Sequence, residues 1–351
     1  MDINSILKEA FLKEASDIHI TPGVPPIYRI HGRLVRTDDS ILTPEMVEEF
    51  VRQITNENQF KILEQKGEID FSYSIKGVSR FRVNVYRQRG SYSIAFRIIP
   101  VNIPPFETLG LPPVLKEFTK LNKGLVLVTG PTGSGKSTTL ASLIDIINKE
   151  RDVHIITLED PIEYLHRHNK SIINQREIGS DTLSFADALR AALREDPDVI
   201  LVGEMRDLET IAIALTAAET GHLVFSTLHT IGAAKTIDRI IDVFPPHQQQ
   251  QIRIQLSTVL QGVVSQQLLT RRDGKGRVVA TEVMIVNPAI RNLIREAKTY
   301  QIQSIIQTHQ RQGMITMEQS LIDLYKRGLI SREDAFNYAT DFDFMQRLLS
   351  A

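Results

Sequence analysis

The segment from Gly130 to Ser137 has the residue types and spacing of a phosphate-binding loop. It reads G-P-T-G-S-G-K-S and matches the pattern G-x-x-x-x-G-K-[ST], directly after an apolar run that predicts a strand and before a predicted helix. Glycines in such a loop let backbone N–H groups converge on phosphate oxygens at the positive end of the helix. A glycine-rich turn that only happens to precede a lysine is the alternative. The flanking strand and helix favour the loop, and we predict that it binds ATP.

Two side chains of this loop are expected to act on the nucleotide directly. Lys136 would reach the β- and γ-phosphates, and the Ser137 hydroxyl would ligate Mg²⁺. ATP and Mg²⁺ are therefore the predicted cofactors. The predicted nucleotide-binding residues are Gly130, Pro131, Thr132, Gly133, Ser134, Gly135, Lys136, Ser137 and Thr138.

Carboxylates follow two other apolar runs. Glu204 comes one glycine after Val199–Val202, and we expect it to hold the metal through a bound water. Glu163 lies in the acidic stretch Glu159–Glu163, and it is the candidate for polarising the attacking water, because ligands in open α/β sheets collect at the carboxyl ends of strands. The alternatives are an acid that merely ends a strand, and an Asp-Pro turn with solvated acids around it.

His222 and His229 flank the apolar run Leu223–Thr227. An isolated histidine is more often a satisfied structural residue than a functional one. Two histidines around one strand of a nucleotide-binding sheet favour a sensor of the γ-phosphate, and that is the prediction for this pair.

The first hundred residues alternate between helical and strand patterns. Apolar residues recur at helical spacing from Ile3 to Leu12, and Thr43 with Pro44 predicts the start of a helix that runs to about Ile54. Strands are expected over Ser16–Ile20, in a hairpin over Ile27–Val35 that turns at His31-Gly32, and within Asp70–Ile99 with turns at Lys76-Gly77 and Arg89-Gly90. We predict an α+β domain with an antiparallel sheet over residues 1–100.

Prolines crowd the next segment, and residues 101–113 are predicted to be an interdomain linker. Beyond it the apolar runs show little alternation, as in strands that are buried on both faces. The predicted strands are Leu125–Thr129, His154–Leu158, Val199–Val202 and Leu223–Thr227, and the helices between them are Thr138–Asn148, Phe185–Arg194 and Leu208–Ala218. This alternation predicts an α/β core domain with a parallel sheet over residues 114–287.

Residues 288–351 are expected to be wholly helical. The predicted helices lie near Ala289–Glu296, Ile302–Arg311, Met317–Arg327 and Arg332–Tyr338.

Composition and charge exclude several classes of protein. Lys plus Arg number 41 against 42 for Asp plus Glu, so no overall cationic field attracts nucleic acid or anionic lipid. The absence of cysteine excludes disulfides, thiolate catalysis and Cys-ligated zinc, and it fits a reducing cytoplasm. No stretch approaches the roughly 18 apolar residues of a spanning helix, so we expect no membrane span. Together with the neutral charge and the absence of cysteine, this predicts a cytoplasmic protein with no nucleic-acid partner.

Four segments taken together resemble one family, the secretion-system ATPases. They are GPTGSGKST at 130–138, TLEDPIEY at 157–164, DPDVILVGEMRD at 196–207 and TAAETGHLVFSTLHT at 216–230, and they resemble the Walker A, Asp-box, Walker B and His-box motifs in that order. Within the family, the sequence is most similar to the motors that retract type IV pili, over essentially the whole chain. The resemblance implies an ATP-hydrolysing motor for pilus retraction and twitching motility.

The same resemblance implies an architecture and partners. It implies a RecA-like P-loop core, an N-terminal PAS-like domain, and a hexameric ring that binds ATP between subunits. The implied partners are an inner-membrane platform protein of the pilus machine and a second retraction ATPase. The motor would work on the cytoplasmic side, associated with the inner membrane at the pilus base.

Arginines donated to the γ-phosphate are also implied by the resemblance. Arg82 and Arg97 suit this role, because the period-2 alternation of their strands points them away from the buried face. Without the resemblance they would be read as solvated strand arginines. Arg190 and Arg194 share a helix face at i, i+4, and three roles are open: to position Glu204, to complete the arginine network, or to pair with acids.

A C-terminal helix resembles a motif of the retraction enzymes that is needed for retraction. Its residues are Ala289, Ile290, Arg291, Asn292, Leu293, Ile294 and Arg295. The alternative is an amphipathic helix with Ile290, Leu293 and Ile294 packed inward, and both interpretations can hold together.

Rival functions differ in features that the sequence can show. The pilus-assembly motors of the family typically carry a four-cysteine zinc insertion, which is absent from this sequence. A ring-shaped DNA translocase should have a basic, aromatic channel, whereas this chain is nearly neutral and lacks tryptophan. An accessory retraction ATPase and a nucleotide-gated binding module with little turnover stay open.

Overall fold

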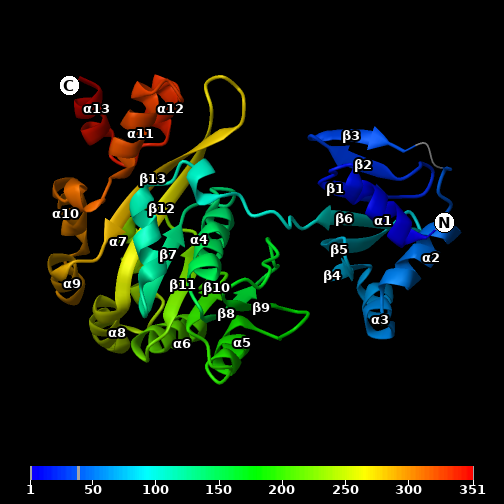
Figure 1. The fold of residues 1–351 in the computed structure, drawn as a ribbon, viewed down its shortest axis with the longest axis horizontal. Helices are drawn as coiled ribbons and strands as arrows, with labels where there is room; N and C mark the ends of the chain where they lie inside the picture. Colours follow the sequence, from blue (N-terminus) through cyan, green and yellow to red (C-terminus); the bar gives the residue numbers. More distant parts are fainter. Residues whose placement is uncertain (1, 38–39, 351) are drawn as a thin grey trace. The chain divides into compact units, whose positions relative to one another are not determined.

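The computed structural model describes residues 2–37 and 40–350 of the chain, which divide into two compact units (Figure 1). Unit 1 comprises the chain up to Asn102 together with Pro161–Leu165. Unit 2 comprises Ile103–Asp160 and the chain from His166 onward. The five-residue segment Pro161–Leu165 therefore belongs with unit 1, although the chain on both sides of it belongs to unit 2.

Unit 1 contains an antiparallel sheet with the strand order β3-β2-β1-β6-β5-β4. Its elements are α1 (Ile3–Leu12), β1 (Asp17–Ile20), β2 (Ile27–Ile30), β3 (Arg33–Arg36), α2 (Pro44–Ile54), α3 (Glu57–Lys66), β4 (Glu68–Ile75), β5 (Ser79–Gln88) and β6 (Ser91–Ile98). The hairpin turns at His31-Gly32 and Arg89-Gly90 have positive φ at both residues, as two-residue connections between antiparallel strands require. The predicted α+β class with an antiparallel sheet is confirmed for this unit.

The core of unit 1 follows from the alternation of its strands. Phe81, Val83 and Val85 of β5 are buried, and the Phe81 ring packs edge-on against Phe96 of β6 at 6.3 Å between centroids. Burying one such side chain contributes about 1.5 to 3 kcal/mol. The residues between them, including Arg82, face the other way, as predicted.

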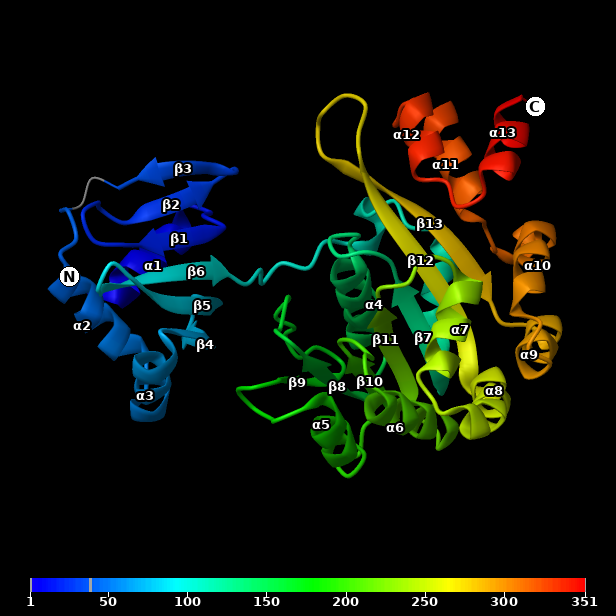
Figure 2. The ribbon, with the colours of Figure 1, turned by 180° about the vertical axis from the view of Figure 1, so that it is seen from behind.

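Unit 2 is built on a mixed sheet with the strand order β13-β12-β7-β11-β10-β8-β9 (Figures 1 and 2). Neighbours from β12 to β9 are parallel, and β13 is antiparallel to β12. Its elements are η1 (Phe106–Thr108), η2 (Pro113–Lys120), β7 (Gly124–Thr129), α4 (Lys136–Glu150), β8 (His154–Glu159), β9 (Ile172–Glu177), α5 (Phe185–Ala192), β10 (Val199–Val202), α6 (Leu208–Glu219), β11 (Leu223–Leu228), α7 (Ala233–Asp242), α8 (Pro246–Val259), β12 (Leu260–Thr270) and β13 (Arg277–Ile285).

Both faces of this sheet are covered, which explains the unbroken apolar runs. In β7, Val126 and Val128 pack with α4 and η2, whereas Leu125 and Leu127 pack with the layer that contains α5 to α8. A strand between two layers must be apolar on both sides. The predicted strands that correspond to β7, β8, β10 and β11 are confirmed.

The strands β9, β12 and β13 were not predicted. β12 and β13 contain buried polar residues, among them Ser265, Gln266 and Glu282, which interrupt the apolar pattern that marks a strand in the sequence. The helices α3, α7 and α13 were missed as well. The proline-rich segment also differs from a free linker, because Phe106 and Leu111 are buried in the core of unit 2.

The C-terminal part of unit 2 is helical. It contains α9 (Pro288–Arg295), η3 (Thr299–Gln301), α10 (Ile302–Thr308), η4 (Gln310–Gln312), α11 (Met317–Lys326), α12 (Arg332–Asn337) and α13 (Phe342–Ser350). Four of the helices were predicted. Reciprocal backbone hydrogen bonds between Val283 and Ile315, of 2.8 and 3.1 Å, tie this part to β13.

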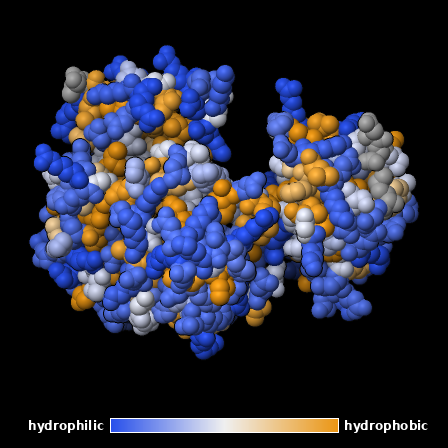
Figure 3. Space-filling model, viewed as in Figure 1, coloured by the Kyte–Doolittle hydropathy of each residue, from blue (hydrophilic) through white to orange (hydrophobic). Residues whose placement is uncertain are grey.

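The surface is mostly polar on the face shown in Figure 3, where hydrophobic residues gather only in small groups among hydrophilic ones. Among the helices of the described residues, none has the length and apolar character needed to cross a bilayer.

Candidate nucleotide-binding site

The predicted phosphate loop connects β7 to α4, and its shape depends on glycine. Gly130, Gly133 and Gly135 have φ values of 140°, 79° and 89°, a region that other residues rarely adopt. A Cβ on Gly130 would lie 2.2 Å from the carbonyl oxygen of Gln266 and 2.7 Å from the Ser134 hydroxyl. Gly135 is the N-cap of α4 and brings no capping side chain. The N–H groups at the start of a helix suit an anionic ligand.

Lys136 is held against the loop that must wrap around the phosphates. Its ammonium group donates hydrogen bonds to the carbonyl oxygens of Gly130 and Pro131, at 2.8 and 3.0 Å, and the residue is 9% exposed. A buried ammonium is costly unless it is paired. An incoming phosphate would supply the anionic partner at this position.

Several buried polar atoms beside the loop have no hydrogen-bond partner among the described residues. They are the hydroxyls of Thr129 and Ser134 and the side-chain oxygen of Gln266. The amide nitrogen of Gln266 donates to the backbone oxygen of Ser134, at 3.2 Å. Unsatisfied buried groups are rare and call for an explanation, and a bound polar ligand is the explanation that fits this loop. The residues present therefore fit a nucleotide.

A cavity of about 420 Å³ opens beside the loop. Gly135 and Thr138 line it on the loop side, and Leu109, Leu268 and Arg277 lie among its other lining residues. Ligand cavities of this size commonly combine apolar walls with a few polar groups. This cavity has room for a nucleoside next to the phosphate loop.

Glu204 and His229 lie together at one edge of the sheet. Each follows the carboxyl end of its strand, β10 or β11, and these strands run parallel to β7, which leads into the phosphate loop. Glu204 Oε2 lies 3.4 Å from Nε2 of His229, and Glu204 Oε1 is paired with Nε of Arg206 at 2.6 Å. Arg206 was not singled out in the sequence, although it lies only two residues beyond Glu204.

His222 does not join this cluster. It lies at the amino end of β11, where its Nδ1 is 2.9 Å from the carbonyl oxygen of Ala217 at the end of α6. The six residues of β11 lie between it and His229, and seven residue steps of about 3.3 Å separate the two histidines by about 23 Å. The two histidines therefore lie at opposite ends of β11. A role of both as sensors of the γ-phosphate stays a prediction.

The contacts of Arg190 and Arg194 involve residues other than Glu204. Arg190 forms ion pairs with Asp187 and Glu209. Arg194 donates to the backbone oxygen of Arg190, at 3.2 Å. Of the three roles left open by the sequence, pairing with acids is the one that Arg190 has in this structure.

Arg82 and Arg97 lie opposite each other on β5 and β6 of unit 1, and both are exposed. Nε of Arg97 pairs with Oδ1 of Asp17 at 2.8 Å. Burial of Asp17 acts to raise its pKa, but hydrogen bonds from Ser16 and Arg97 outweigh burial and lower the pKa. Arg97 is thus held in place by an ionised carboxylate.

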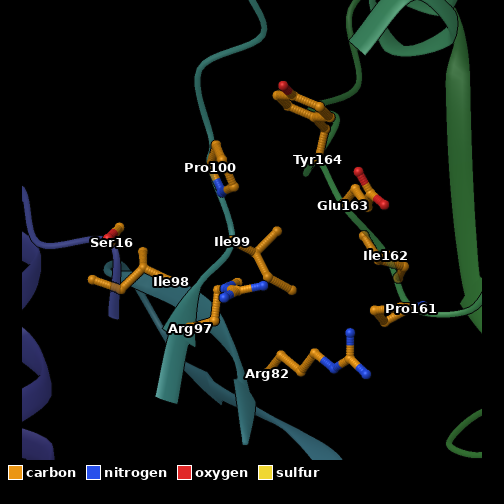
Figure 4. A pocket seen from close by; sticks show the side chains of 10 residues that line it. All are labelled: Ser16, Arg82, Arg97, Ile98, Ile99, Pro100, Pro161, Ile162, Glu163 and Tyr164. Carbon is orange, nitrogen blue, oxygen red and sulfur yellow. The ribbon is translucent and has the colours of Figure 1, made fainter. Parts of the chain in front are cut away.

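The segment Pro161–Leu165 closes a pocket of unit 1 against these arginines. Figure 4 shows Arg82 and Arg97 on the sheet side, and Pro161 to Tyr164, including Glu163, on the other side. The pocket has a volume of about 300 Å³, and the Leu165 N–H donates to the Pro100 oxygen at 3.2 Å. The structure therefore brings Glu163 together with both arginines inside one unit. Their roles toward ATP remain predictions.

The C-terminal motif forms α9, and the predicted inward face is present. Ile290 and Ile294 are fully buried, and Leu293 is partly buried. Arg291 also turns inward, since its Nη1 donates to the carbonyl oxygens of Ser257 and Thr258, at 2.5 and 2.7 Å, near the end of α8. Burial, followed by the charge of Arg295, lowers the pKa of Arg291.

Comparison with known proteins identifies the family. Residues 1–336 match the family model described as Type II/IV secretion system protein. The chain belongs to this family. It is 52% identical over 335 residues to the type IV pilus retractation ATPase PilT of Pseudomonas aeruginosa, covering 95% of this chain and 97% of that protein. It is 41% identical to the type IV pilus ATPase PilU of the same organism, covering 97% of this chain and 89% of PilU.

Solved structures agree with this assignment. A crystal structure of the pilus retraction motor PilT with bound ADP has a TM-score of 0.91 and 55% identity, covering 99% of both chains. The ATPase DotB of Legionella pneumophila has a TM-score of 0.82 and 31% identity, covering 95% of this chain and 93% of DotB. The predicted enzyme class, an ATPase of the secretion family, is confirmed, and so is the predicted likeness to pilus retraction motors.

Proposed function

We propose that this chain is the ATP-hydrolysing motor that retracts type IV pili and thereby drives twitching motility. The observation that carries the proposal is the full-length likeness to a pilus retraction ATPase at 52% identity. The pilus assembly ATPase PilB of Acinetobacter baylyi is 39% identical over 250 residues, and the match covers only 42% of that protein. Identity to the type IV pilus ATPase PilU is lower, at 41%.

ATP is proposed to bind with its phosphates on the loop 130–138 and its base in the adjoining cavity. Backbone N–H groups of the loop and Lys136 would hold the phosphates. The apolar side chains of Leu109 and Leu268 would cover the base, and Arg277 would lie beside it. Ser137 would hold Mg²⁺ directly and Glu204 through a water; a bound Mg²⁺ neutralises charge on the phosphates.

Glu163 is proposed to take the proton of the attacking water, and Arg82 and Arg97 to stabilise the charge of the transition state. His229 would report on the γ-phosphate through its contact with Glu204, which is 3.4 Å away. Glu163 and the arginines belong to unit 1 and the phosphate loop to unit 2, so ATP binding is proposed to close the linker and bring the arginines to the γ-phosphate. We propose that the hinge is the first part of the predicted linker 101–113, ahead of Phe106, since Phe106 and Leu111 are buried in the core of unit 2.

The working form is proposed to be a homohexamer with ATP bound between subunits and a PAS-like unit 1 in each. Successive closures around the ring would act on an inner-membrane platform protein from the cytoplasmic side. The motif on α9 would serve retraction, and a second retraction ATPase would be a further partner. The family relationship supports this arrangement.

Complementation of a strain whose pili extend but do not retract tests the physiological role. The wild-type chain should restore twitching, and a Lys136→Ala chain expressed at the same level should not. If the wild-type chain hydrolyses ATP but leaves pili extended, the retraction role is wrong and only the ATPase activity stands.

A further inference from the structure

Two polar side chains lie side by side in the interior of unit 2. Ser265 on β12 and Glu282 on β13 are directly paired across the strands, and they are 0% and 2% exposed. A buried carboxyl group is strongly unfavourable unless it is fully hydrogen-bonded. Both side chains therefore need hydrogen-bond partners inside unit 2.

The pair holds the start of α7. The Ser265 hydroxyl accepts a hydrogen bond from the Gly232 N–H at 2.9 Å, and Oε1 of Glu282 accepts one from the Ala233 N–H at 2.8 Å. Gly232 is the N-cap of α7 and has no side chain to cap it. The two strands supply the cap that the local sequence lacks, at two consecutive N–H groups.

The capped end lies only three residues beyond His229. The Thr236 hydroxyl donates to the Gly232 oxygen at 2.8 Å and lies 2.7 Å from the Thr230 hydroxyl. The turn 229–232 is thus held by β11 at one end and by the Ser265–Glu282 pair at the other. His229, which approaches Glu204 to 3.4 Å, is the first residue of that turn.

Glu282 also contacts the C-terminal helices. The Gln303 side chain of α10 and the backbone N–H of Met317 at the start of α11 both act to lower the pKa of its carboxyl group. Burial raises the pKa of Glu282, the Ala233 N–H opposes this, and the nearby Glu318 adds to it. Glu318 is itself buried, and its Oε1 accepts from the N–H groups of Thr340 and Asp341.

We propose that Glu282 is a positioning residue for ATP hydrolysis. With Ser265 it holds the end of the turn that begins at His229, by accepting hydrogen bonds from the Gly232 and Ala233 N–H groups. The inference rests on the proposed role of His229 at the nucleotide site. Among the described residues, the Ser265 and Glu282 side chains hydrogen-bond to the start of α7 and not to the phosphate loop. Glu282 would therefore affect hydrolysis through His229 and not by touching ATP.

Steady-state kinetics of the full-length oligomer test the proposal. Glu282→Met removes the acceptors at similar volume, and kcat should fall about tenfold or more, as when a partner that orients a functional side chain is lost, while KM for ATP stays within about threefold. Glu282→Gln keeps one acceptor for the Ala233 N–H and should recover most of kcat. Glu318→Met removes a neighbouring buried acid that does not contact α7, and it should lower the melting temperature with less than about a threefold loss in kcat.

A double-mutant cycle with His229→Ala separates positioning from general destabilisation. If Glu282 acts through His229, the double variant should be no slower than His229→Ala alone. Losses that multiply would overturn the inference while leaving the role of His229 intact. A normal kcat for His229→Ala would instead overturn the role of His229 itself, and the inference with it.

Ser265→Ala keeps the test decisive if Glu282→Met does not fold. Ser265→Ala removes only one of the two acceptors, so its loss in kcat should be smaller than that of Glu282→Met. When His229 is already alanine, Ser265→Ala should cause no further loss. If Glu282→Met does not fold, a kcat equal to that of wild type for Ser265→Ala would overturn the proposal.

Discussion

The phosphate loop and the β12–β13 hairpin meet in space but differ in how their residues acquire a role. In the loop, Gly130 and Lys136 are six residues apart and contact each other directly. In the hairpin, Gln266 contacts Ser134 across 132 residues of sequence. A contiguous motif carries its own geometry, whereas a polar side chain on a buried strand acquires its role only from the neighbour that the fold provides.

For the phosphate loop, the change with the largest expected effect is Lys136→Ala. Removing the ammonium group should abolish measurable ATP binding and turnover, because the loop then has no cation for the β- and γ-phosphates. Isothermal titration with Mg·ATP and a phosphate-release assay would measure this. Residual tight binding would mean that the backbone cradle alone suffices.

Glu204→Gln and Glu163→Gln test residues that the fold has to bring to the nucleotide. Both should keep ATP binding and lose turnover, by about 10²- to 10⁴-fold for Glu163 if it is the general base. Binding and single-turnover hydrolysis should be measured on the same preparations. Normal hydrolysis by either variant would remove its assigned role.

The buried side chain of His166 predicts a pH dependence of the stability of the fold. Its Nδ1 is buried without a partner among the described residues, and burial lowers its pKa to about 4 from 6.5. Above about pH 6.5 the ring is neutral in both the folded and the unfolded chain. As pH falls from there to about 4, the unfolded chain takes up the proton first, and the free energy of unfolding should decrease by up to ~3 kcal/mol.

Urea unfolding between pH 7.5 and 4.5 would measure this decrease. His166→Gln should flatten that part of the pH dependence relative to the parent chain. An unchanged slope in the variant would show that other groups cause it.

Gln266→Leu tests the hairpin side of the comparison. Losing the bond to the Ser134 oxygen removes about 0.5 to 1.5 kcal/mol of support for the loop, so KM for ATP should rise about 2- to 10-fold with little change in kcat. The matched control is Gln267→Leu, since Gln267 is also buried but donates to the Tyr338 oxygen instead. Equal effects of both changes on KM would argue against a specific role for Gln266.

Arg291→Ala should have the smallest effect on ATPase activity, within about threefold of wild type. Its guanidinium holds carbonyl oxygens of α8 and touches no residue of the phosphate loop in the bonds described here. Retraction should nevertheless be lost, as measured by twitching zones and by pilus dynamics in live cells. Unchanged twitching would contradict the role of α9.

Much of unit 1 and the loop could be predicted because the relevant information is local. Two-residue turns such as His31-Gly32, the alternation of Phe81, Val83 and Val85, and the loop spacing before Lys136 each depend on neighbours in the sequence. The predictions failed for β12 and β13, because the polar residues buried there are satisfied by distant segments and do not produce an apolar pattern.

The amino-acid sequence by itself determined the family, the phosphate loop and the two sheet-forming regions, because glycine spacing and hydrophobic periodicity act over short distances. Only the tertiary structure decided that His229 lies with Glu204 while His222 lies at the far end of β11, and that Pro161–Leu165 carries Glu163 to the arginines of unit 1. The physical reason is that strand direction and the pairing of buried polar groups are set by contacts between distant parts of the chain.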